Sequence, residues 1–438
     1  PELGLGMAFV VGQVDTVDLD NAMKIIFEDS VVNNVVTDTE LLDLFEEDNN
    51  IMREETTGGR YIETAQYFGL PAGVGARHEN DYIPVPNGPT IQNSRIYLKK
   101  IQGVVDMTGD VMKRVRSSEG AFLNWADRAL PDLVERLRHE LDRMMLSYGA
   151  GIKARVNDGA PDATLGVDSA FGLAGLTNQH LQFLEGESVV FSANATGDPL
   201  RDSGTSAEVT DINDAGDTLT LDALPTGVAD DDYIFPGDDS GFSGQGTSGS
   251  DREPMGLLGM VDDGSVLATF QNITRANWKL WRSITHDAGT GALTEDVLTE
   301  VDDEVFVEGG GQPNAIVTSR AQIREYWKDL RADRTLNDPR SYTGGKGDQV
   351  GVFLGDRTIQ LRVARKMPPE LAFLLQTDTF KRWQLGTFEW DDTTGSIWRQ
   401  VTDATGRKDA FYAYGNMYLQ MGCLHPRKNA KIENLGTT

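Results

Sequence analysis

The chain has 438 residues and a formal net charge of −28, from 68 acidic residues against 40 Lys and Arg. A field of that sign works against binding of free nucleic acid or anionic membranes. Hydrophobic residues make up 39%, and no apolar run approaches the ~20 residues that a membrane helix requires. One cysteine, Cys423, excludes a disulfide framework and a thiolate zinc site. We expect a soluble, non-membrane chain with room for two or three domains.

The acidic residues are spread along the chain rather than gathered in a tail, and Arg outnumbers Lys among the cations. Solubility alone would explain this balance. Adaptation to molar salt explains it better, because the screening length there falls to ~3 Å and self-repulsion is suppressed. We therefore expect a halophilic origin.

Residues 1–55 resemble an arm more than a domain. Their apolar positions fit two short helices that have no local partner to bury them. This segment is expected to lie against another part of the protein or against another subunit.

Residues 56–98 are predicted to form a long two-stranded hairpin. Strand-like pieces at 60–67 and 94–105 bracket a stretch rich in Gly, Pro and Asn, with an irregular tip near 73–81. An isolated hairpin of this kind is marginal in water, so it needs a surface to lie on.

The segment 117–149 predicts one long helix. Its apolar residues recur every three or four positions from Phe122 to Tyr148, which draws one stripe along a helix. Ser117 or Ser118 suits the N-cap, and Gly149 suits the end. Pro131 lacks an N–H, so we expect a kink or two abutting helices there.

A Gly- and Ala-rich stretch, 155–180, is expected to be mostly loop, and residues 186–236 read as a small β module of short alternating strands. The turn DINDAGD offers three weak metal candidates, Asp211, Asp214 and Asp217. No glutamate closes an EF-hand loop there, so turn chemistry on an acidic surface explains the motif better, and no metal or other cofactor is expected. A Gly/Ser linker follows at 240–250.

After residue 262 the sequence pattern changes to alternating helices and strands, which is typical of an α/β region. A helix capped by Thr294 carries the stripe Leu298, Val301 and Val305. A buried strand at 315–317 leads into a second helix, two strands flank the two prolines at 368 and 369, and hairpins end the chain. The turn TDATGRK carries Arg407 and Lys408 at its tip.

The sequence contains no convincing catalytic grouping, and we do not expect an enzyme. HELDR at 139–143 begins like a zinc-protease motif, but Arg143 stands where the second histidine belongs. Cys423 lies in an apolar strand pattern and reads as a buried, inert thiol. The one dense basic cluster holds Lys113, Arg114 and Arg116, which suit either phosphate contact or a solvated, ion-paired patch.

The order of arm, long hairpin, long helix, α/β region and late hairpin resembles the major capsid protein of tailed double-stranded DNA viruses, the Hong Kong 97-type fold. The class would be α+β. The resemblance divides the chain into an N-arm (1–55), an E-loop (56–98), a P domain (99–160 and 378–418, with spine helix 117–149), an insertion (161–250) and an A domain (251–377 and 419–438).

The resemblance implies a structural protein of the virion, assembled in the host cytoplasm. Identical copies would form hexamers and pentamers of an icosahedral shell around packaged double-stranded DNA, which they would contact nonspecifically. A portal, a scaffold or protease, and a cement protein would be partners. The acidity of the chain would fit a halophilic archaeal host, although a capsid protein of a marine bacterial virus could be nearly as acidic.

Some members of this family carry a lysine on the E-loop that bonds covalently to a neighbour. Residues 56–98 contain no lysine, so the resemblance implies a non-covalent shell. The expected intersubunit contacts are Tyr67, Phe68, Arg77, Glu79, Asp81, Arg407 and Lys408, with the last two pairing to acids of a neighbouring tip.

Two other functions stay open. An encapsulin-like compartment shell would share the fold but enclose cargo enzymes. An acidic secreted hydrolase of a halophile would fit the composition, although the chain shows neither a signal peptide nor a catalytic grouping.

Overall fold

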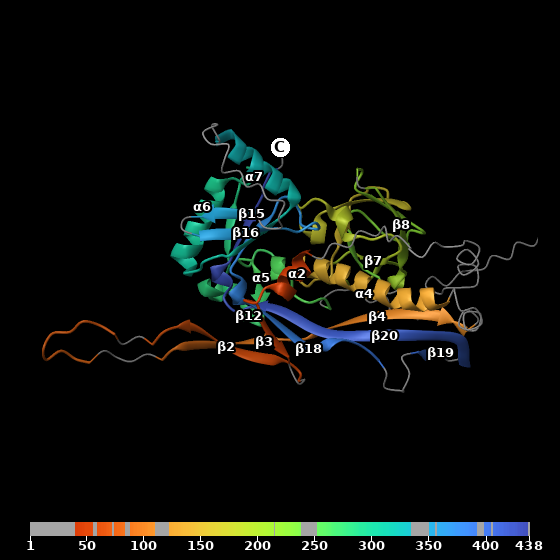
Figure 1. Ribbon diagram of the computed structural model, residues 1–438, viewed down its shortest axis with the longest axis horizontal. Coiled ribbons are helices and arrows are strands. Elements are labelled where there is room, and N and C mark those ends of the chain that lie inside the picture. The colour runs from red at the N-terminus through yellow and green to blue at the C-terminus, as the bar shows by residue number, and fades with distance from the viewer. Residues whose placement is uncertain are drawn as a thin grey trace, which may run out of the picture.

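The computed structural model describes residues 40–55, 59–71, 74–83, 88–109, 122–213, 215–237, 252–333, 350–354, 357–391, 398–403 and 406–436. Three large hydrophobic cores organise them: one between the long helix and the long sheet, one in an α/β layer and one inside a small barrel. A smaller cluster of Ile152, Val190 and Phe235 lies beside the barrel. The expected mixture of helices and strands is confirmed (Figure 1). Among the described residues, no helix combines the length and apolar character needed to cross a membrane.

The long sheet is organised by β20 (Gly406–Cys423). Antiparallel to it run β18 (Phe380–Trp390), β19 (Arg399–Asp403) and β4 (Lys99–Thr108), and β1 (Met52–Glu55) adds to β18 in parallel. The late hairpin expected from the sequence is thus confirmed. Helix α4 (Phe122–Leu146) runs along β4 and β20 (Figure 1).

Helix α4 forms one element through Pro131 rather than two abutting helices. Its buried residues Leu137, Leu141 and Met145 join the core over the sheet, and such packing supplies most of a helix's stability in a protein. The expected caps at residues 117 and 118 lie outside the described residues.

The end of the arm belongs to the chain's own core. Helix α2 (Glu40–Glu47) buries Leu41, Leu42 and Phe45 there. Asp142 of α4 accepts hydrogen bonds from the N–H groups of Leu41 and Leu42, both at 3.0 Å, and so satisfies the first turn of α2. This confirms that the segment lies against another part of the protein; its first expected helix falls outside the described residues.

The expected hairpin is formed by β2 (Ile62–Gly69) and β3 (Thr90–Ile96), paired from Ile62 opposite Ile96 onwards. It stands clear of the body and extends sideways from it (Figure 1). A short ribbon of β11 (Thr269–Phe270) and β12 (Ile273–Thr274) holds its root, where Arg95 N–H donates to the carbonyl of Gln271 at 2.9 Å.

The α/β layer contains a six-stranded sheet in the order β13-β21-β17-β14-β16-β15. Its strands are β13 (Ile284–Asp287), β21 (Ala430–Glu433), β17 (Ala372–Leu375), β14 (Ala315–Thr318), β16 (Arg357–Val363) and β15 (Val350–Leu354). Helices α6 (Glu295–Glu304), with a π-turn at Val305–Gly309, and α7 (Arg320–Asp333) accompany it. The Thr294 cap and the buried stripe of α6 are confirmed.

The β module is a closed six-stranded barrel in the order β10-β5-β6-β9-β8-β7. Its strands are β5 (Ala154–Val156), β6 (Thr164–Asp168), β7 (Ser188–Ser192), β8 (Ala207–Asn213), β9 (Thr218–Leu221) and β10 (Tyr233–Pro236). Residues 155–180, which we expected to be mostly loop, also contain β6 and the end of β5. Strands of three and five residues are too short to show a period, and only barrel closure defines them.

Shorter helical elements complete the fold. They are α5 (Leu257–Met260) and 3-10 turns at Ala170–Gly172, Gln179–Gln182, Arg201–Gly204, Arg275–Asn277, Lys279–Trp281, Thr377–Thr379 and Pro426–Lys428.

Candidate intersubunit contact site

The hairpin and its outer loop expose large apolar side chains to solvent. Val74 is 99% exposed, Tyr82 94%, and Leu70 and Ile83 88% each. Tyr67 and Ile91, which face each other across the strands, are also exposed. Apolar groups gathered on one element and rimmed by polar residues are typical of a surface that another molecule covers.

Phe68 lies differently from Tyr67. Its ring stacks on Trp278 with 4.8 Å between centroids and meets Trp281 edge-on at 5.7 Å. Trp281 is buried, and its Nε1–H donates to the carbonyl of Phe270 at 3.1 Å. Successive residues of a strand face opposite sides, so Tyr67 points outward while Phe68 anchors the hairpin to its own chain. Sequence reasoning placed both Tyr67 and Phe68 at the interface, because the two tryptophans that Phe68 contacts lie far away in the chain.

The tip of the hairpin is charged. Arg77, Glu79 and Asp81 are exposed, and the Asp81 carboxylate accepts the His78 N–H at 3.0 Å. Arg407 and Lys408 are exposed near the β19–β20 turn. Figure 1 places the hairpin tip and β19 at opposite ends of the molecule, so these two charged groups do not meet within one chain.

The structure does not bring together the candidate DNA-facing residues or the candidate metal ligands. The basic residues Lys113, Arg114 and Arg116 lie outside the described residues, as does Asp214. Asp211 and Asp217 flank the β8–β9 turn, and the Asp217 carboxylate contacts His180 Nδ1 at 2.8 Å. The described part of the chain holds no group of three His, Cys, Asp or Glu side chains that could bind a metal ion.

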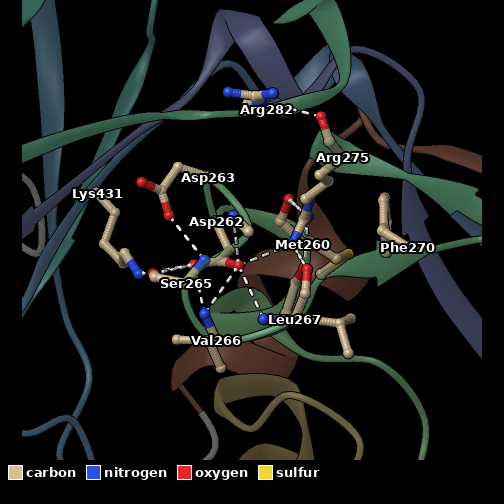
Figure 2. A network of polar contacts seen from close by, with 12 residues as sticks. Met260, Asp262, Asp263, Ser265, Val266, Leu267, Phe270, Arg275, Arg282 and Lys431 are labelled. Carbon is tan, nitrogen blue, oxygen red and sulfur yellow. Dashed lines mark hydrogen bonds and ion pairs between the residues drawn. The ribbon is translucent and has the colours of Figure 1, made fainter. Parts of the chain in front are cut away.

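A buried carboxylate joins the long-sheet core to the α/β layer. Asp262 is fully buried and lies 3.0 Å from Arg275 and 3.2 Å from Lys431 of β21. It also accepts backbone N–H groups, among them that of Leu267 at 3.0 Å (Figure 2). Burial alone would raise the pKa of Asp262, but Lys431, the Leu267 N–H and Arg275 outweigh it and lower that pKa.

A second buried network joins α4 to the barrel. Arg143 pairs with Glu253 and Glu140, and Lys153 before β5 pairs with Glu187 before β7 at 2.7 Å. Lys153 also reaches Glu140 at 3.4 Å. Charges this deep must be paired, so the contacts fix how the barrel sits on the helix.

His139, the first residue of HELDR, belongs to this region rather than to a metal site. Lys366 Nζ lies 3.0 Å from His139 Nδ1 and donates to the His139 carbonyl. Burial is the largest cause, and the positive charge of Lys366 the next, that lower the pKa of His139 to about 4. Charged residues on the buried face of a helix are the sequence signal that could have indicated this junction.

Cys423 is the buried thiol that its apolar strand predicts. It is fully buried in β20, and burial raises its pKa to about 11. The thiolate is the reactive form, so this cysteine is inert at neutral pH.

No protein-family model and no curated protein matches this sequence. Solved structures do resemble its fold. The cyanophage A-1(L) capsid asymmetric unit matches with a TM-score of 0.54 and 12% identity, over 96% of this chain and 99% of that one. The chain has the Hong Kong 97-type capsid fold.

Two further structures match this Hong Kong 97-type chain less closely. The capsid of Myoviridae phage XM1 gives a TM-score of 0.47 and 8% identity, covering 96% of this chain and 99% of that one. The holo-SrpI encapsulin complex from Synechococcus elongatus gives 0.42 and 9%, covering 96% of each chain.

Proposed function

We propose that this chain is the major capsid protein of a tailed double-stranded DNA virus. It self-assembles into hexamers and pentamers of an icosahedral shell, is built into the virion and encloses the genome. One observation carries the proposal: in a chain with a capsid fold, the β2–β3 hairpin stands clear of the body and exposes Leu70, Val74, Tyr82 and Ile83. Neighbouring copies of the same chain would cover them.

In this proposal the parts keep the roles that the resemblance implies. Residues 56–98 act as the E-loop and α4 as the spine of the P domain, while the six-stranded sheet belongs to the A domain. The barrel is an insertion between them; because β5 belongs to it, the insertion begins at Ala154 rather than at residue 161.

The shell would be held without covalent cross-links. Residues 56–98 contain no lysine, and Lys99 and Lys100 lie at the start of β4. Tyr67 and the apolar tip supply buried area, while Arg407 and Lys408 pair with Glu79 or Asp81 of a neighbour. An exposed ion pair contributes only ~0–1 kcal/mol, but a shell repeats it many times.

The remaining partners follow from the proposed role. Packaged DNA would be contacted nonspecifically, with Lys113, Arg114 and Arg116 as candidates for the inner face. A portal, a scaffold or protease, and a cement protein would complete the particle. The acidity of the chain fits a halophilic archaeal host.

Electron microscopy of the purified protein, in molar salt and after dialysis to low salt, tests the proposal. Icosahedral shells, or rings of five and six copies, are expected, and shells that dissociate at low salt would support the halophilic origin. Monodisperse monomers at high concentration in both buffers would contradict shell formation. Particles from infected cells that hold protein cargo and no DNA would favour the compartment shell.

A pair of variants connects assembly to the hairpin. Tyr82→Ser with Ile83→Ser removes two side chains that are 94% and 88% exposed, so shells should be lost while circular dichroism and monomer stability stay unchanged. The conservative pair Tyr82→Phe with Ile83→Val keeps the apolar surface and should still assemble.

A further inference from the structure

Helix α6 of the α/β layer exposes a row of carboxylates. Asp296, Glu300 and Asp303 are exposed and follow one another at steps of four and three residues. Such steps place side chains on one face of a helix, and this face is opposite to the buried stripe of α6. Residues 295–309 contain no Lys or Arg. We call these three carboxylates the acidic stripe.

Helix α7 exposes a row of cations, which we call the basic stripe. Its members Arg320, Arg324 and Lys328 recur every four residues and are exposed, Arg324 at 66% and Lys328 at 52% of the side chain. The acid closest to them, Glu325, is only 3% exposed and lies 2.7 Å from Lys328 and 3.8 Å from Arg324. A positive helix face therefore stands out on a chain whose net charge is −28.

The two stripes form no ion pair with each other in the described part of the chain, although both helices pack on the same core. Asp302 of α6, beside the stripe, pairs with Arg357. Figure 1 places α6 at the left of the α/β layer and α7 along its top, so the stripes lie on different surfaces. Opposite charges on different surfaces of one chain suit a contact in which one copy binds the next head to tail.

Exposed apolar side chains continue the acidic stripe. In the π-turn after α6, Phe306 is 57% exposed and Val307 79%. Glu308 pairs with Lys279 at 3.3 Å and also with Arg427, while Gly309 packs directly against the Arg427 carbonyl, with no room for a Cβ. These contacts hold the turn in place with its two apolar side chains outward. Large apolar side chains exposed among charges are typical of an interaction surface.

We propose that the acidic stripe of one copy binds the basic stripe of the next copy within each ring, with Phe306 and Val307 at the edge of the contact. This inference rests on the proposed function and names a contact separate from the hairpin. Two different surfaces meet in it, so each copy has one neighbour on either side and the series of contacts closes into a ring. A misoriented neighbour would bring like charges together, so the stripes would also set the orientation of the copies.

Charge reversal tests the contact. Glu300→Arg with Asp303→Arg makes α6 basic like α7, and Arg320→Glu with Arg324→Glu makes α7 acidic like α6. Either variant alone should need at least a tenfold higher concentration to form rings. Mixed in equal amounts, the two should alternate in rings of six but not form rings of five, because an odd ring leaves one like-charged contact. All four substitutions in one chain should restore both ring sizes.

Native mass spectrometry measures these rings under the salt conditions in which the unmodified chain forms them, and circular dichroism checks the fold of each variant. Glu185→Arg with Asp211→Arg makes the same change of charge at exposed acids of the barrel and should assemble like the unmodified chain. Normal rings from either reversed variant, or no recovery in the mixture, would overturn the contact while shell formation stands.

A cross-link tests the same contact without counting rings. Cys423 is fully buried, so Asp303→Cys in one preparation and Arg324→Cys in another supply the exposed thiols. A bismaleimide should join the two variants when they are mixed, and should join neither variant to itself. Shells without this cross-link would overturn the contact. The cross-link in a chain that forms no shells would support the contact and contradict the proposed function instead.

Discussion

Phe68 of the hairpin stacks on Trp278, with 4.8 Å between the two ring centroids. The hairpin is therefore fixed to its own chain at its root while its outer part is exposed. Removing the ring by Phe68→Ala should lower the free energy of unfolding by about 2 kcal/mol, from lost burial and aromatic contact together. Urea unfolding measures this, and hydrogen exchange should quicken in β2.

Tyr67→Ala is the matched control, because that ring is 65% exposed on the opposite face of the same strand. It should change the stability of the monomer by less than about 0.5 kcal/mol. Equal losses in the two variants would contradict the anchoring role of Phe68.

His139 makes the stability of the chain depend on pH. Its pKa, lowered to about 4 by burial and by Lys366, lies below the value of about 6.5 for an unfolded histidine. The unfolded state therefore binds more protons between these values, so stability is present above about pH 6.5 and is lost as the pH falls towards 4. Between pH 7.5 and pH 5 the loss should be about 2 kcal/mol.

Denaturant unfolding at a series of pH values checks this expectation. His139→Gln cannot be protonated and should flatten the profile over this interval. His78→Gln, on the exposed hairpin tip, should leave the profile unchanged. A slope that persists in His139→Gln would assign the pH dependence to other groups.

Asp262 is the residue whose charge the core depends on most directly. Asp262→Asn removes the counter-charge of Arg275 and Lys431, which are fully buried beside it (Figure 2). Lys431 keeps its ion pair with Glu433, but Arg275 loses its carboxylate, and leaving a buried cation without its counter-charge costs about 3–5 kcal/mol, which thermal and urea unfolding would detect. Asp263→Asn alters the exposed neighbour, which accepts the Ser265 N–H at 2.9 Å, and should cost less than about 1 kcal/mol.

Arg407 tests the proposed pairing between subunits. Arg407→Glu should raise the protein concentration needed for assembly several-fold, since each exposed contact contributes ~0–1 kcal/mol and is replaced by repulsion. Adding Glu79→Arg in the same chain should restore assembly, as followed by light scattering at low and high salt. Arg136→Glu changes an exposed arginine of α4 and serves as the control. Unaltered assembly of Arg407→Glu would remove this contact from the proposal.

Elements with a strong local pattern could be predicted from the sequence. The stripe Leu298, Val301 and Val305 and its Thr294 cap define α6 without help from the rest of the chain. The first hairpin strand was equally clear, but the second, expected at 94–105, is β3 at Thr90–Ile96, and most of 94–105 belongs to β4, which pairs with β20 instead. The order of these elements was enough to indicate the capsid fold.

Features that depend on a distant partner were not predictable. Strand β1, with the sequence MREE, has no apolar pattern and exists because β18 pairs with it. Likewise β5 is three residues long and is defined by barrel closure. The roles of Phe68 and His139 required knowledge of Trp278 and Lys366, which come from other parts of the chain.

The hairpin has two separate attachments to one sheet. The chain enters it from β1, which pairs with β18, and leaves it through β3 directly into β4, which pairs with β20. These two connections, with the stacking of Phe68 on Trp278, attach the root of the hairpin firmly to the body. A slight twist of the sheet would displace the tip of the hairpin much more than its root. Small distortions of the sheet would therefore be amplified at the tip, where the proposed shell would place a neighbouring copy.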